Sequence, residues 1–177
     1  MKIKIVILVL VAFIIQSCEI NNTPENYFDR AVLNTNLVVN IGSTDLNSMV
    51  LQKENKSLMG SVDGKFIAQE SAELYITSWQ IVDIENKIKS IEELKPTEET
   101  KEMIDRSLKL FNFVLERYKT EYVAIAKLLD NGAPKSEIEA AITDFDAKYI
   151  TKFEELHNSV LEVGIPYAEA NGIQVSY

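Results

Sequence analysis

Apolar residues recur every three or four positions along residues 97–132. We expect the other helices of the chain to pack around this stretch. The repeating residues are Ile104, Leu108, Phe111, Leu115, Tyr118, Tyr122, Ile125 and Leu129. This spacing puts them on one side of a helix, and an apolar side of that length needs partner helices to cover it. We therefore predict a central helix within a helical bundle.

Two further stretches carry a similar spacing and supply the partner helices. Residues 65–94 place Ile67, Leu74, Ile81, Ile84, Ile88 and Ile91 on one side. Residues 136–163 do the same with Ile138, Ile142, Phe145, Tyr149, Phe153, Leu156, Val160 and Val163. The step of four residues from Tyr149 to Phe153 shifts the apolar side around the last helix, which favours a globular bundle over a long coiled coil.

Start and stop signals separate these three helices. Pro96 ends the second helix, because the residue before a proline resists the helical conformation, and Thr97 is placed to cap the central helix. The connector 133–136 is so short that the last helix should run antiparallel to the central one, with Ser136 as its cap. Gly164 to Pro166 predict that the last helix kinks or ends there.

A fourth helix is expected before these three. Thr23 and Pro24 form a good helix start, with a hydroxyl cap followed by proline in the first turn. We expect this helix over residues 24–53, with a kink at Gly42. Residues 54–64 contain two glycines and several polar residues, so they read as a loop.

The predicted fold is therefore all-α, an antiparallel bundle of three to four long helices. The chain has 177 residues, of which 46% are hydrophobic, and this is enough for one domain with a real core. Only six glycines and four prolines interrupt it, as expected for long helices. Trp79 lies off the apolar side of its helix, and we interpret it as a packing residue and not as a ligand site.

The first residues have the features of a signal peptide. Lys2 and Lys4 precede an unbroken apolar run from Ile5 to Ile15. Eleven residues are too few to cross about 30 Å of hydrocarbon as a helix, but they suit the core of a signal peptide. We therefore expect the chain to be exported and this segment to be cleaved.

The sequence Ile15-Gln16-Ser17-Cys18 resembles the lipobox of bacterial lipoproteins, with an aliphatic residue three before the cysteine and a small residue just before it. The resemblance implies cleavage before Cys18 and attachment of diacylglycerol to its thiol. It divides the chain into a signal peptide (1–17), a lipidated tether (18–23) and the helical bundle domain (24–177). Acyl chains on Cys18 would then hold the protein on the membrane.

Glu19 follows the cysteine and is not the aspartate that favours retention in the inner membrane of enteric bacteria, so the resemblance implies the outer membrane. In outline, the mature domain is similar to small helical surface lipoproteins of bacteria such as spirochaetes and Bacteroidetes. No motif of the mature domain names a family, and the resemblance carries over no functional residues beyond Cys18.

Net charge limits the kinds of partner the protein can bind, and cysteine content limits its disulfide bonds. The formal net charge is -9, and without Lys2 and Lys4 it becomes -11, from sixteen basic and twenty-seven acidic side chains. Nucleic acids and anionic lipid surfaces both require clustered basic residues, so neither is expected as a partner. Cys18 is the single cysteine, so the chain can form no internal disulfide.

One pair of residues has the spacing of a metal motif. Glu154 and His157 form Glu-x-x-His, which carboxylate-bridged metal proteins use on a bundle helix. A complete site would also need inward-facing carboxylates from other helices. The candidates are Glu70, Glu85, Glu116 and Glu121. Phe153 and Leu156 occupy the apolar side of the same helix, so we interpret Glu154 and His157 as residues of its exposed side whose spacing arises by chance. We therefore predict no metal and no cofactor.

Three functions remain open at this point. The first is a non-enzymatic envelope lipoprotein that binds an envelope protein or a ligand through its surface, with an exposed apolar patch. The second is the carboxylate-bridged metal protein. The third is a small-molecule binder with an aromatic-lined pocket, although aromatics at helical spacing more often form the core. The pocket candidates are Tyr75, Tyr118, Tyr122, Tyr149, Tyr167, Phe111, Phe113, Phe145 and Phe153. We favour the first and expect no enzymatic activity.

Overall fold

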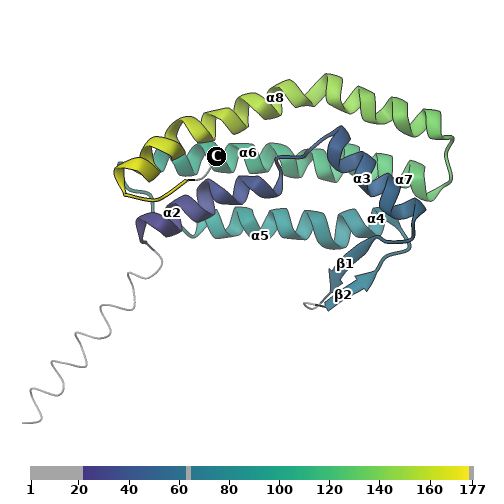
Figure 1. Ribbon diagram of the computed structural model, residues 1–177, viewed down its shortest axis with the longest axis horizontal. Helices are drawn as coiled ribbons and strands as arrows, with labels where there is room; N and C mark the ends of the chain where they lie inside the picture. Colours follow the sequence, from purple (N-terminus) through teal and green to yellow (C-terminus); the bar gives the residue numbers. More distant parts are fainter. Residues whose placement is uncertain (1–21, 63–64, 176–177) are drawn as a thin grey trace, which may run out of the picture.

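The computed structural model describes residues 22–62 and 65–175, and these residues form a helical bundle with one small β-hairpin (Figure 1). The prediction of an all-α fold is confirmed. Three long helical stretches lie antiparallel, and a shorter, broken stretch packs against them at its start. Among the described residues, no helix is both long and apolar enough to span a membrane.

The central helical stretch consists of α6 (Lys101–Arg117), the π-helical turn η3 (Tyr118–Tyr122) and α7 (Val123–Asp130). Thr97 was predicted to cap this helix, but α6 begins later, with Thr100 at the cap position and no side-chain cap bond. The hydroxyl oxygen of Thr97 instead accepts a hydrogen bond of 3.2 Å from the N–H of Thr100 in the turn before α6. The buried side is wider than the predicted one, since α6 packs against both α5 and α8. Consequently Leu110 and Val114 are fully buried, whereas the predicted Leu108, Leu115 and Leu129 are only half-buried.

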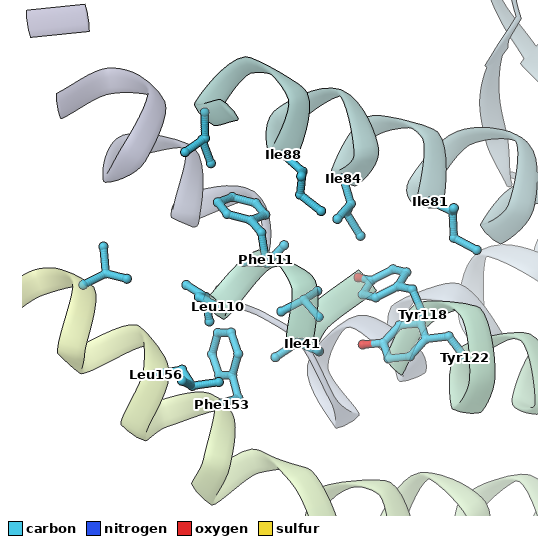
Figure 2. Packing of buried hydrophobic residues seen from close by; sticks show 14 of the residues in the cluster. Ile41, Ile81, Ile84, Ile88, Leu110, Phe111, Tyr118, Tyr122, Phe153 and Leu156 are labelled. Atoms are coloured by element: carbon cyan, nitrogen blue, oxygen red, sulfur yellow. The ribbon is translucent and has the colours of Figure 1, made fainter. Parts of the chain in front are cut away.

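The two partner helices flank this central stretch. One is formed by α4 (Ala72–Tyr75), the π-helical turn η2 (Ile76–Gln80) and α5 (Ile81–Glu92), and the other is α8 (Lys135–Ala170). Figure 2 shows Ile81, Ile84 and Ile88 of α5 on one side of the core, and Phe153 and Leu156 of α8 reaching it from the other. These five side chains are buried, as their spacing predicts.

The stretch predicted as a loop and a helix start forms a β-hairpin instead. Strand β1 (Met59–Val62) pairs antiparallel with β2 (Lys65–Ala68), and the helix begins only at Ala72. Ile67 had been assigned to the helix because it precedes Leu74 by seven residues, but both side chains are about half exposed, at 43% and 50%. Ile67 therefore lies on a strand and not in the predicted helix, whereas Leu74 lies in α4 as predicted but is not part of the buried side.

The helix predicted over residues 24–53 is broken into separate pieces. These are α2 (Pro24–Ala31), the 3₁₀ helix η1 (Leu33–Leu37) and α3 (Ser43–Glu54). The chain turns at Gly42, whose φ of 98° lies in the region that favours glycine. A Cβ atom there would also lie 2.5 Å from Oδ1 of Asp146. The interruption is thus much larger than a kink.

The last helix differs from prediction at both ends. α8 begins at Lys135, directly after Pro134, with no side-chain cap, so Ser136 lies inside its first turn. At the other end it continues through Gly164 and Pro166 to Ala170. A proline removes one N–H donor and disfavours a helix, but here burial of Gly164 and Ala168 against neighbouring elements holds the helix together.

The two π-helical turns coincide with hydroxyl side chains that bond back to the helix backbone. Thr77 and Ser78 in η2 donate to the carbonyl oxygens of Glu73 and Leu74, and Thr120 in η3 donates to that of Glu116. Such bonds compete with the backbone N–H groups for the same carbonyls. Thr143 makes the same kind of bond within α8, so back-bonding contributes to the wider turns but does not by itself produce them.

Candidate functional site

The predicted lipidation residue, Cys18, lies outside the described residues, as do the signal peptide 1–17 and most of the tether 18–23. The first described residues lead directly into α2, where the hydroxyl of Thr23 accepts a hydrogen bond of 3.3 Å from the N–H of Asn26. The predicted cap at the start of the bundle domain is therefore present.

Glu154 and His157 lie on α8 along a shallow groove of about 340 Å³, which the segment 39–44 closes on its other side. Glu154 is exposed, and the ring of His157 stacks on that of Phe153 with centroids 5.7 Å apart. Burial lowers the pKa of His157. Within the described part of the chain, no group of three or more His, Cys, Asp or Glu side chains is arranged to hold a metal ion.

Three of the four carboxylates proposed to complete that metal site have charged partners, and the fourth, Glu70, lines a different groove. Glu85 pairs with Lys119 at 2.6 Å. Glu116 and Glu121 both pair with Arg117, at 2.6 Å and 3.3 Å. The structure thus brings neither Glu85, Glu116 nor Glu121 to the groove that Glu154 and His157 line.

Most of the aromatic residues considered as a pocket lining are packed in the core. The rings of Tyr118 and Tyr122 stack with centroids 4.0 Å apart (Figure 2). Phe145 packs edge-on against Tyr122, with centroids 5.3 Å apart. Tyr149 instead covers the guanidinium of Arg117, which lies 4.5 Å from the ring centroid. Of these aromatic residues, only Phe153 lines the groove beside Glu154 and His157.

A buried polar cluster fixes the start of α3 against the central helix. The hydroxyl of Tyr118 donates to Asp45 at 2.7 Å, and the N–H of Gly42 donates to the hydroxyl of Tyr122 at 2.8 Å. Asp146 of α8 accepts from the N–H of Ser43 at 2.9 Å. Burial raises the pKa of Asp45. These bonds hold the chain in place where the helical path is interrupted, between η1 and α3. We therefore assign the cluster a structural role.

A second polar cluster, around Asp130, joins the hairpin region to the central helix. The carboxylate of Asp130 accepts hydrogen bonds from the N–H groups of Ala72 and Glu73 at 2.8 and 2.9 Å, and from the hydroxyl of Ser71 at 2.7 Å. Lys53 pairs with it at 2.8 Å. Burial alone would raise the pKa of Asp130, but these donors, Lys53 first, lower it to about 2.

Exposed apolar side chains gather on the hairpin and on the helix against which β1 packs. Phe66 is 70% exposed, and its ring lies 5.5 Å from that of the half-buried Trp79. Val82, 44% exposed, follows Trp79 by three positions, which places it on the same side of the helix. We call Phe66, Trp79 and Val82 the hairpin surface. A patch of this kind commonly marks a binding site.

The hairpin surface lies away from the end at which the chain enters the bundle. Figure 1 shows the hairpin projecting from one side of the bundle, beside the start of α5, whereas α2 begins at the opposite end. Sequence reasoning missed this surface because it assigned the residues to a loop and a helix. The signal was present, since Asp63-Gly64 between two short apolar runs is typical of a hairpin turn.

Comparison of the chain with known protein families, with curated proteins and with solved structures gives no match. The candidate function therefore depends on the residues and geometry described above.

Proposed function

We propose that this protein is a lipid-anchored lipoprotein of the bacterial cell envelope that binds a partner protein through the hairpin surface and has no enzymatic role. The observation that carries the binding proposal is Phe66, a large aromatic side chain that is 70% exposed beside Trp79 on a projecting hairpin. The sequence Ile15 to Cys18 supports the anchor, because the single cysteine stands where lipid attachment needs it.

Replacing the lipidation residue tests the anchor. In Cys18→Ala the thiol that would carry the lipid is lost, so we expect the protein to leave the membrane fraction of the cell and to lose incorporation of a labelled fatty acid. Cys18→Ser would behave in the same way, which separates loss of lipid from a change in side-chain size. Unchanged membrane association of both variants would contradict the anchor.

Photo-cross-linking in intact cells tests the hairpin surface. A photoreactive residue placed at Lys65, which is exposed beside Phe66, should cross-link to one defined envelope protein. Adding Phe66→Ser should reduce this product at least fivefold, since a buried aromatic anchor typically contributes more than 1 kcal/mol to an interface.

Leu33→Ser is the matched control for that experiment, because Leu33 is also an exposed apolar side chain, at 43%, but lies on η1. It should leave the cross-linked product unchanged. Equal products from Phe66→Ser, Leu33→Ser and the parent chain would exclude the hairpin surface as the binding site.

A further inference from the structure

Strand β2 has an open edge whose backbone groups are arranged to pair with another strand. The N–H of Gln69 donates to the carbonyl of Leu58 at 2.8 Å, and the register places Ala68 opposite Met59. Because the ladder bonds alternate in an antiparallel pair, the N–H and C=O groups of Phe66 and Ala68 point away from β1. All four residues of β2 are exposed, so these groups are accessible to a third strand.

A groove with lysine side chains lies beside this edge. It has a volume of about 450 Å³ and is lined by Lys53, Lys56, Ala68, Gln69 and Glu70. The ammonium group of Lys53 is held by Asp130 and by the carbonyl of Glu70. Lys56 is exposed and forms no ion pair with another described residue. The groove thus offers an available cation in a chain whose net charge is -9.

We propose that an extended segment of the partner protein adds to β2 as a third strand and places an acidic side chain beside Lys56. This inference rests on the proposed function and specifies the chemistry of the partner. The backbone groups of Phe66 and Ala68 select an extended chain, and Lys56 selects the acidic residue. A second copy of this chain fits less well, because two molecules of the same net charge repel each other and β2 has only four residues.

The single tryptophan of the chain provides a direct readout of binding, because Trp79 contacts Phe66 on β2. The probe is a synthetic seven-residue peptide of alternating valine and threonine that ends in two glutamates. Added to the full-length protein in detergent, it should change the fluorescence of Trp79 in a saturable way below about 1 mM. The same peptide with alternate backbone nitrogens methylated should not, because it cannot complete the strand pairing.

A proline substitution separates strand pairing from side-chain contact. Ala68→Pro removes an N–H that points away from β1, so it should leave the hairpin intact but raise the Kd for the peptide at least about tenfold. Ala68→Ser retains the N–H and is the matched control. Lys56→Glu should raise the Kd about threefold, whereas Glu70→Gln should lower it, because Glu70 is the acidic side chain in the groove.

The outcomes distinguish this inference from the proposed function. If Phe66→Ser abolishes cross-linking in cells while Ala68→Pro leaves it unchanged, the partner binds through side chains, and strand addition is wrong although the proposed function holds. If neither variant changes cross-linking, both fail. Concentration-dependent dimerisation that Ala68→Pro abolishes would assign the edge to a second copy and would also overturn the inference.

Discussion

At the scale of single residues, Gly164 shows how closely α8 approaches the first part of the chain. A Cβ atom at this position would lie 2.6 Å from Cγ2 and 3.0 Å from Cγ1 of Val32, which is itself buried. A valine side chain is stiff because it is branched at Cβ, so it cannot easily move aside. Glycine is therefore needed here for space, although it is a poor helix former.

This contact predicts the effect of Gly164→Ala. Alanine favours a helix by about 1 kcal/mol, but overpacking against Val32 should cost about 1–3 kcal/mol. We expect a net loss of about 1 kcal/mol in the free energy of unfolding, measured by chemical denaturation of the full chain.

A double-mutant cycle with Val32→Ala provides the control. The smaller side chain makes room for the new methyl group, so the two substitutions should couple favourably by at least about 0.5 kcal/mol. Additive effects of Gly164→Ala and Val32→Ala would show that the steric contact is not the cause.

Also at the residue scale, the candidate metal motif shows what spacing alone can predict. Glu154 and His157 are one helical turn apart, as the sequence indicates, but a metal site needs carboxylates from other helices. Glu121 pairs with Arg117 four residues before it on the same helical stretch, a spacing that the sequence indicates. Glu85 pairs with Lys119 of another helix, and no local pattern in the sequence specifies that partner.

At the scale of elements, Asp130 joins three segments that are distant in the sequence. Its carboxylate binds the N-terminal N–H groups of α4 and the ammonium group of Lys53 at the end of α3. It therefore acts as a helix cap supplied by another helix, in addition to the cap from Ser71 within the same turn. This arrangement positions the hairpin between α3 and α4.

The element-scale prediction concerns Asp130→Ala and its dependence on pH. Because the folded pKa, about 2, is below the ordinary value of 3.8, the ionised carboxylate stabilises the fold above pH 4. That contribution is lost as pH falls toward 2. The shift corresponds to about 2 kcal/mol, so Asp130→Ala should lower the free energy of unfolding by about that amount at pH 7.

The difference between the parent chain and Asp130→Ala should shrink as pH falls from 4 to 2, as followed by helical circular dichroism in urea. Asp144→Ala is the control, since Asp144 forms an exposed pair with Lys148 and its loss should change stability by less than about 0.5 kcal/mol. A pH-independent difference would exclude the carboxylate charge as the cause.

The elements also show which parts of the fold a sequence reveals. The buried side of α5 was predicted because Ile81, Ile84 and Ile88 follow a helical spacing that local physics fixes. Before α3 a kink at Gly42 was predicted in place of the full break, since Tyr122 and Asp146, distant in the sequence, supply the bonds that hold the break. The hairpin was missed because its two short strands lay within patterns read as a loop and a helix.

At the scale of the whole molecule, the hairpin is an addition to a bundle that already has its own core. Leu58 is fully buried just before β1, and the backbones of Leu58 and Gln69 are hydrogen bonded. The chain therefore enters and leaves the hairpin at nearly the same point. We expect the bundle to tolerate its removal.

Replacing residues 59–68 by a short glycine-serine linker tests this expectation. Helical circular dichroism should be retained. The free energy of unfolding should fall by less than about 2 kcal/mol, because the linker joins two points that already lie close together, and the entropy cost of closing a loop depends only weakly on its length. Collapse of the helical signal would show that the hairpin is part of the core and not an addition to it.

With the proposed lipid anchor and binding surface, the length of α8 would set the distance between the bilayer and a bound partner. Its 36 residues correspond to about 54 Å, and α2, which follows the proposed lipid anchor, begins at the end away from the hairpin (Figure 1). A bundle standing upright on its acyl chains would carry β2 tens of ångströms above the headgroups. A protein bound there would be either a membrane protein that extends equally far from the bilayer or a freely diffusing protein. It would not bind through a segment embedded in the same leaflet.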